Sequence, residues 1–160
     1  MNAQNINIRE YLPFDLKETA SLFFESIRRG AARHYTEEQL LAWAPEVPNK
    51  DVWRDRMHGL KTWIAETEDQ IIGFMSLTET GHIEFAFVHP DWIGKGIAGR
   101  LYGFVERYAL AKRMPALTSD ASLFARPLFE RHGWRALKKQ QPMRNGVTLT
   151  NFRMEKILAY

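Results

Sequence analysis

The sequence contains no cysteine among its 160 residues. This absence excludes disulfide bonds, thiolate metal ligands and a cysteine nucleophile that could carry an acyl group. No apolar stretch approaches the roughly 20 residues that a membrane-spanning helix needs, and residues 1–8 contain no basic segment leading into an apolar one. We therefore expect a cytoplasmic protein that neither spans a membrane nor is exported.

The sequence also lacks a large excess of either charge. It has 22 lysines and arginines and 19 aspartates and glutamates, which give a formal net charge of +3. We interpret the local basic clusters as solvated faces of helices and strands; they comprise Arg28, Arg29, Arg33, Arg131, Arg135, Lys138 and Lys139. A nucleic-acid partner is therefore not expected, and it would be revealed by a strongly salt-dependent affinity for DNA or RNA. The five histidines have no metal-ligand spacing, so no metal site is predicted.

The sequence has no linker, repeat or low-complexity tract. With 45% hydrophobic residues, the chain is expected to form one domain over residues 1–160 with a substantial core. Hydrophobic periodicity, capping signals and turn residues predict a mixed α/β fold. The predicted strands are residues 6–10, 62–66, 70–77, 82–88 and 116–119, followed by two strands on either side of a turn at 144–146. The predicted helices are residues 15–29, one beginning at 36–39, a short one at 53–59, one beginning at 97 and one at 122–131.

The segment 87–101 is the most informative part of the sequence. An apolar strand ends there at a proline, and a loop with Gly94, Gly96 and Gly99 leads directly into an amphipathic helix. Glycine lets the backbone turn sharply and approach a ligand, while the free N–H groups and positive dipole end of a helix attract anions. Lys95 adds a mobile cation, so the junction predicts a phosphate site. The alternative is an ordinary strand-to-helix turn whose glycines serve packing.

This loop resembles the acetyl-CoA pyrophosphate loop of the GCN5-related N-acetyltransferases (GNAT), which is usually written Gln/Arg-x-x-Gly-x-Gly/Ala. The motif falls on residues 93–98, where Gly96 and Ala98 match its last two specified positions. Ile93 departs from the usual Gln or Arg, which removes that side chain's contribution and leaves the backbone cradle unchanged.

A second block, residues 121–134, is similar to the family's Asn-x-x-Ala-x-x-x-Tyr-Glu-x-x-Gly-Phe segment. Ser122 stands in place of the Asn, and Phe129 in place of the Tyr. Within the family, the likeness is greatest to the YafP-like acetyltransferases. Shared short matches, such as Asp-Ala-Ser at 120–122 and Thr-Asn-Phe at 150–152, run through most of the chain.

The resemblance implies a twisted mixed sheet of about seven strands flanked by helices and splayed between strands 4 and 5. It also implies an acetyl-CoA-dependent N-acetyltransferase that acts by direct attack in a ternary complex on a primary amine of a small molecule, peptide or protein. The alternative is a coenzyme A binding module with little or no transferase activity, which the departures at Ile93 and Phe129 favour. The residues implied in coenzyme binding are Phe87, Val88, Ile93, Gly94, Lys95, Gly96, Ile97, Ala98, Gly99, Arg100, Ser122 and Phe129.

The strand 82–88 is where catalytic groups are expected. Alternation places Ile83, Phe85 and Phe87 on one face, and His82, Glu84, Ala86 and Val88 on the other. Acetyl transfer needs a neutral amine, so a base must remove a proton, directly or through water. The family often places that base on this strand, which makes Glu84 the first candidate and His82 the second. The alternative is that both are ordinary polar residues of the strand, and a β-bulge would change which side chains face the cleft.

The leaving thiolate needs a proton, and the family's usual donor is the Tyr that Phe129 replaces. Phe129 is therefore expected only to pack against the coenzyme, and the proton is expected from water or from Tyr108. Tyr108 equally fits the buried stripe of its helix. The resemblance further implies that the Val88 N–H stabilises the developing oxyanion.

The resemblance implies that the region between the first two helices covers the acceptor cleft. His34, Tyr35 and Trp43 are the main candidates, with Trp53 as a weaker one and Asp120 after the fifth strand. Packing of both tryptophans within the helices is an equally good interpretation. The oligomeric state is open, with a homodimer as one expectation.

Overall fold

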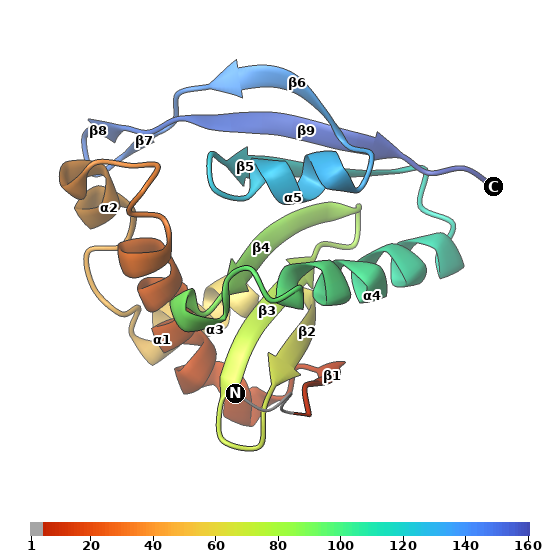
Figure 1. The fold of residues 1–160 in the computed structure, drawn as a ribbon, viewed down its shortest axis with the longest axis horizontal. Coiled ribbons are helices and arrows are strands. Elements are labelled where there is room, and N and C mark those ends of the chain that lie inside the picture. The colour runs from red at the N-terminus through yellow and green to blue at the C-terminus, as the bar shows by residue number, and fades with distance from the viewer. Residues whose placement is uncertain (1–4) are drawn as a thin grey trace.

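The computed structural model describes residues 5–160 and shows a twisted sheet with helices against both faces (Figure 1). The sheet has seven strands in the order β1-β2-β3-β4-β5-β9-β6, and a separate hairpin is formed by β7 and β8. The strands are β1 Asn7–Glu10, β2 Lys61–Glu66, β3 Ile71–Leu77, β4 His82–Val88, β5 Ala116–Ser122, β6 Arg135–Gln140, β7 Met143–Arg144, β8 Val147–Thr148 and β9 Asn151–Ile157. The helices are α1 Leu16–Glu25, α2 Glu37–Trp43, α3 Lys50–Met57, α4 Ile97–Ala111 and α5 Arg126–Arg131, with short turns η1 Pro13–Asp15, η2 Ser26–Gly30 and η3 Pro90–Trp92.

The sheet parts between β4 and β5. These strands run parallel, and their pairing is limited to His82 with Thr118 and Ile83 with Ser119. Beyond these two pairs the strands diverge, and Figure 1 shows the sheet separating into two halves. The predicted mixed sheet of seven strands, splayed between the fourth and fifth, is confirmed.

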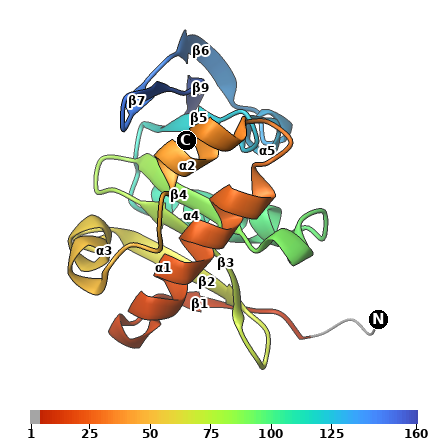
Figure 2. The ribbon, with the colours of Figure 1, turned by 90° about the vertical axis from the view of Figure 1, so that its left-hand side faces the viewer.

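Two apolar cores lie on opposite faces of the sheet. On one face, Phe23 of α1 and Trp53 of α3 pack against Phe85 and its neighbours. On the other face, the apolar stripe of α4, including Leu101, packs against Ile72 of β3. Figure 2 shows α1 in front of the strands and α4 beyond them.

The helix predicted over 15–29 is divided in the structure. It comprises α1, which ends at Glu25, and the wider π-helical turn η2. The Ser26 hydroxyl in this turn donates a hydrogen bond to the Val88 carbonyl at 3.0 Å. Because π-turns commonly occur at functional sites, this connection to the end of β4 is notable.

A β-bulge in β4 changes the predicted faces of that strand. The register between β3 and β4 shifts between Ile83 and Phe85, so Glu84 is an extra residue with no counterpart on β3. Ile83 therefore packs in the core beneath α4, whereas Phe85 and Phe87 pack in the core beneath α1 and α3. The prediction that these three side chains share a face is wrong for Ile83, because the bulge reverses the alternation.

Three element boundaries also differ from the predictions. The last helix begins at Arg126 instead of residue 122, because Ser122 ends β5 and its hydroxyl accepts the Ala125 N–H at 3.0 Å. α3 begins at Lys50, because the Asn49 side chain accepts the Val52 N–H and caps the helix. The turn predicted at 144–146 connects β7 and β8, a short hairpin that comes between β6 and β9 along the chain. Within residues 5–160 no helix is long and apolar enough to cross a membrane.

Candidate active site

The glycine loop leaves open space above the start of α4. Gly94 and Gly96 have φ angles of +83° and +79°, a left-handed conformation that residues with a side chain rarely adopt. A Cβ built on either glycine would meet nothing within 4 Å. The first turn of α4 has no side-chain cap and no acidic residue, so its N–H groups and positive dipole end face this space. These features fit a phosphate group held mainly by the backbone.

The side chains of the loop contribute less than its backbone. The Lys95 ammonium lies 5.3 Å from the centre of the Trp92 ring. Ile93 is 45% exposed, and its Cδ1 lies beside Gly30 of η2. Arg100 donates a hydrogen bond to the Ile6 carbonyl at 3.2 Å, so its guanidinium is directed toward the N-terminal strand. Ile97 is buried in the core, which fixes the helix start against the sheet.

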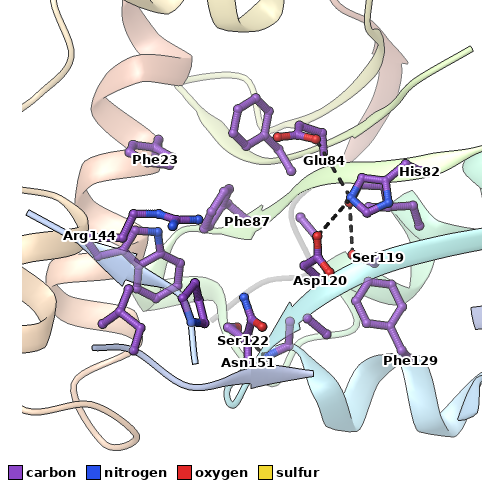
Figure 3. A pocket seen from close by; sticks show the side chains of 18 of the residues that line it. Phe23, His82, Glu84, Phe87, Ser119, Asp120, Ser122, Phe129, Arg144 and Asn151 are labelled. Carbon is purple, nitrogen blue, oxygen red and sulfur yellow. Dashed lines mark hydrogen bonds and ion pairs between the residues drawn. The ribbon is translucent and has the colours of Figure 1, made fainter. Parts of the chain in front are cut away.

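A cavity of about 440 Å³ lies in the splay between β4 and β5 (Figure 3). Its volume is that of a site for a small molecule. β4 forms one wall, and β5, β9 and the β7–β8 hairpin form the others. The lining residues are Phe23, Tyr35, Trp43, Arg56, His82, Ile83, Glu84, Phe85, Ala86, Phe87, Ser119, Asp120, Ala121, Ser122, Ala125, Phe129, Pro142, Arg144, Leu149, Thr150 and Asn151.

The Val88 backbone N–H points away from β3, toward the splay. Hydrogen-bonded and non-hydrogen-bonded pairs alternate along an antiparallel ladder. The His89 N–H donates to the Ile72 carbonyl at 2.8 Å, so the next pair, Val88 with Gly73, is a non-hydrogen-bonded one. The Val88 carbonyl accepts from Ser26, as described above, and the Val88 N–H faces the gap between the strands. This is the position expected of an oxyanion donor.

His82 lies between two carboxylates at one end of the cavity (Figure 3). Its Nδ1 is 2.8 Å from the Thr118 hydroxyl on β5. Its Nε2 is 3.6 Å from an Asp120 carboxylate oxygen and 4.0 Å from one of Glu84. Asp120 also pairs with Arg153 at 3.3 Å and accepts from Gln140 at 2.9 Å. The side chains of Asp120 and Glu84 are about equally exposed, at 42% and 44%, so the two carboxylates differ in their partners and not in their accessibility.

Most of the predicted acceptor and catalytic residues meet in this cavity. Glu84, His82, Tyr35, Trp43 and Asp120 all line it. Trp43 packs edge-on against Tyr35, with ring centres 5.4 Å apart. The Tyr35 hydroxyl donates to the Thr150 carbonyl, just before β9, and accepts the Leu123 N–H, just after β5. Burial raises the pKa of Tyr35.

Three candidates lie elsewhere. Tyr108 packs on Trp63 of β2, with ring centres 5.3 Å apart, and does not line the cavity. His34 is exposed beside Phe124, also outside the cavity. Trp53 is fully buried, and its indole N–H donates to the Thr19 hydroxyl at 3.0 Å. The packing interpretation therefore describes Trp53 correctly.

The two residues that depart from the family's second motif line the cavity near β5. The Ser122 hydroxyl accepts the Ala125 N–H, so it shapes the turn before α5. Phe129 is 1% exposed, and its ring centre is 4.6 Å from that of Trp134. Phe129 thus contributes packing at the cavity wall, together with Phe87 on the opposite side (Figure 3).

Several residues that line the cavity belong to no motif that would predict a functional role from the sequence. Arg56 and Arg144 come from α3 and β7, and nothing in their local sequence indicates that they meet. Phe23 packs in the core beneath α1, and it also reaches the cavity. Asn151 lies in the Thr-Asn-Phe match, which is the one signal that could have identified it.

A splayed mixed sheet, an open glycine loop at a helix start and a cavity containing acid–base groups together define an acyl-CoA-dependent transferase. The family model described as "Acetyltransferase (GNAT) domain" matches residues 31–156. The uncharacterized N-acetyltransferase YafP of Escherichia coli K12 is 33% identical over 150 residues, which cover 94% of this chain and 95% of that protein.

Solved structures agree with this match. A GCN5-related N-acetyltransferase from Rhodopseudomonas palustris has a TM-score of 0.90 and 35% identity, with 99% of each chain covered. The PaiA N-acetyltransferase from Thermoplasma acidophilum, solved in complex with coenzyme A, shares the fold with a TM-score of 0.75 at 19% identity, covering 96% of this chain and 99% of that one. This chain belongs to the GNAT family of acetyltransferases. The predicted family, fold and enzyme class are confirmed.

Proposed function

We propose that this enzyme transfers the acetyl group of acetyl-CoA to a primary amine by direct attack in a ternary complex. The observation that carries this proposal is the arrangement around the splay: the open start of α4 follows the end of β4 along the chain, and Glu84 and His82 of the same strand line the cavity in the splay. A coenzyme A binding module without activity is less favoured, because it would not need acid–base groups in the cavity.

The backbone of the glycine loop would hold the pyrophosphate of the donor. Gly94 and Gly96 provide the open space, and the first N–H groups of α4, at Ile97 to Gly99, provide the donors. Lys95 adds a positive charge at the same place. Phe87 and Phe129 would enclose the acyl end of the donor, whose thioester supplies an activated carbonyl carbon. Ile93 and Arg100 point elsewhere, so we assign them no direct contact.

Glu84 would accept the proton of the attacking amine, through water where the distance requires it. His82 is held by Thr118 and lies beside both Glu84 and Asp120, so it would orient water and share the proton. The Val88 N–H would donate to the carbonyl oxygen as negative charge develops there. These roles follow from position, and each is a proposal.

The leaving thiolate would take its proton from water. Phe129 has no proton to donate, and the packing of Tyr108 on Trp63 leaves it away from the cavity. The acceptor would lie between Tyr35, Trp43 and Asp120. A cytoplasmic location and a homodimer stay predictions.

The test is consumption of acetyl-CoA in the presence of a panel of primary amines, measured as release of free coenzyme A thiol. We expect turnover with at least one amine and direct binding of acetyl-CoA in a calorimetric titration. Binding of acetyl-CoA without turnover on any amine or peptide would instead support the binding module. Absence of acetyl-CoA binding would contradict both.

A further inference from the structure

Two arginine side chains line the cavity without a carboxylate partner. Arg56 and Arg144 form none of the ion pairs found among residues 5–160, and the side-chain hydrogen bond of Arg144 goes to the neighbouring Met143 carbonyl at 3.1 Å. Other arginines of the protein do find carboxylates, as Arg54 does with Asp51 at 2.9 Å. Unpaired guanidinium groups facing a cavity are available to an incoming anion.

Arg56 is held in place by aromatic rings. Its guanidinium lies 5.0 Å from the ring centres of Phe23 and Phe85 and 5.4 Å from that of Trp53. Burial lowers the pKa of Arg56, and the like charge of Arg144 acts in the same direction, opposed by the charge of Glu84. Stacking on rings fixes the side chain but satisfies none of its N–H donors.

The charges in the cavity are separated. Figure 3 shows Arg144 reaching in from one side, while Glu84, His82 and Asp120 lie on the other. A molecule that spans the cavity therefore meets carboxylates and an imidazole at one end and the Arg144 guanidinium at the other, with Arg56 close enough to both Glu84 and Arg144 for their charges to act on its pKa. The aromatic rings between these ends provide an apolar surface.

We propose that the acceptor is a small amine that also carries a carboxylate, with an amino acid bearing an apolar side chain as the simplest case. This inference depends on the proposed acetyltransferase function. The amine would lie toward Glu84, and the carboxylate would pair with Arg144 and Arg56. A guanidinium recognises a carboxylate through two parallel hydrogen bonds, and two opposed pairs of charges match a zwitterion. The cavity of about 440 Å³ has the size for such a molecule.

The test compares amines that differ only in the carboxylate. The pairs are L-phenylalanine with 2-phenylethylamine and L-leucine with isoamylamine, and kcat/KM is measured for each under saturating acetyl-CoA. We expect the amino acid of each pair to be preferred by roughly 10- to 100-fold, the scale of a hydrogen-bonded charge pair.

Variants identify the source of this preference. Arg144→Gln and Arg56→Gln should each lower kcat/KM for the amino acids by roughly tenfold or more, since each removes a charge-assisted bond. The values for the two decarboxylated amines should stay the same. Arg54→Gln is the matched control, because it lies on α3 outside the cavity and should change neither class. Melting temperatures show whether each variant is folded.

Equal kcat/KM for both members of each pair in the wild type, or equal losses for both classes in the arginine variants, would overturn the inference. If no amine is acetylated, the proposed acetyltransferase function is contradicted. The acceptor class is then tested by the binding of acetylated products alone. N-acetyl-L-phenylalanine and N-acetyl-2-phenylethylamine are then titrated into the protein with coenzyme A present. Tighter binding of the carboxylate compound that is lost in Arg144→Gln supports the inference, and equal or undetectable binding of both overturns it.

Discussion

The imidazole Nε2 of His82 lies 4.0 Å from a carboxylate oxygen of Glu84, within the bulged part of β4. His82 is the first residue of the strand and Glu84 is the extra residue of its bulge. The bulge turns Ile83 into one core and Phe85 into the other, and it leaves the two polar side chains together at the cavity. A local irregularity in one strand thus brings the two proposed acid–base groups together.

We predict that Glu84→Gln lowers the turnover rate by roughly 100-fold, a typical effect of removing a general base. The substitution keeps the shape of the side chain, so affinity for acetyl-CoA should change little. His82→Gln should have a smaller effect. The measurement is kcat over a range of pH with a competent amine, and the Glu84→Gln rate should rise more steeply with pH as free amine becomes available.

Glu79→Gln is the control for this prediction, since Glu79 is an exposed residue in the turn before β4. It should leave kcat and its pH dependence unchanged. If Glu84→Gln turns over like the wild type while His82→Gln is nearly inactive, the two roles are reversed.

Gly99→Glu should weaken acetyl-CoA binding by at least about tenfold, because juxtaposed like charges cost several kcal/mol. An acidic residue in the first turn favours the helix itself, so α4 should keep its stability. Gly103→Glu, one turn further along α4, is the matched control and should bind acetyl-CoA normally. Calorimetric titration measures both, and equal affinity of Gly99→Glu and the wild type would contradict the phosphate site.

Gly96→Val tests the same loop by adding a side chain where the phosphate is expected to lie. Its side chain would occupy the open space above α4, and we expect acetyl-CoA binding to be lost. Because Gly96 has a φ of +79°, the substitution also strains the backbone. The melting temperature must therefore be measured alongside, and normal binding by a folded Gly96→Val would contradict the assignment.

The features that the sequence could predict depend on neighbours along the chain. Glycine spacing, the end of β4 and the apolar stripe of α4 are local patterns. They predict a phosphate site at the glycine loop, and the family resemblance of that loop predicts the splayed sheet. The bulge at Glu84 could not be placed, because alternation in one strand does not reveal the register of its partner.

The two arginines of the cavity could not be predicted from the sequence either. Arg56 and Arg144 come from α3 and β7, elements that lie far apart in the sequence, and only the tertiary fold brings both to one cavity. Tyr108 shows the reverse case: helical spacing predicts that it lies in the buried stripe of its helix, and the structure shows its ring packed on Trp63 of β2. His34 and Tyr35 are adjacent in sequence, yet only Tyr35 faces the cavity.

Phe129→Tyr should keep acetyl-CoA affinity and leave kcat unchanged or raised, since it restores the hydroxyl that the family commonly has. Truncation to alanine is less informative, because Phe129 is buried against Trp134 and its loss would cost about 3–5 kcal/mol of stability. Titration and steady-state kinetics check the prediction, with Phe104→Tyr on α4 as a control. A fall in kcat at unchanged affinity and melting temperature would contradict it.

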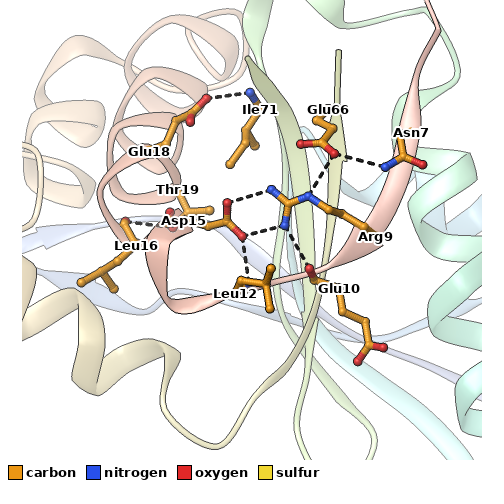
Figure 4. Close-up of polar contacts among 10 residues, drawn as sticks. All are labelled: Asn7, Arg9, Glu10, Leu12, Asp15, Leu16, Glu18, Thr19, Glu66 and Ile71. Atoms are coloured by element: carbon orange, nitrogen blue, oxygen red, sulfur yellow. Dashed lines mark hydrogen bonds and ion pairs between the residues drawn. The ribbon is translucent and has the colours of Figure 1, made fainter. Parts of the chain in front are cut away.

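Arg9 and Asp15 join β1 to the start of α1 (Figure 4). Both Asp15 carboxylate oxygens accept from the Arg9 guanidinium at 2.8 Å, and one also accepts the Leu12 N–H at 2.8 Å. Burial by itself would raise the pKa of Asp15, but the hydrogen bonds and charge of Arg9, with the Leu12 N–H, outweigh it and hold that pKa below its usual value. The ionised carboxylate is thus favoured by folding.

Asp15→Asn should therefore lower the free energy of unfolding at pH 7 by about 3 kcal/mol, the scale of breaking a buried ion pair. Because the folded pKa lies below the unfolded value of about 3.9, this stabilisation is fully present above that pH and is lost as the pH falls through the folded pKa. Urea denaturation at pH 7 and at steps below pH 4 should show the wild type and the variant converging. Asp51→Asn, which removes an exposed pair with Arg54, should change the free energy by less than about 1 kcal/mol. A gap between wild type and Asp15→Asn that persists unchanged well below pH 4 would mean that the charge of Asp15 contributes nothing to stability.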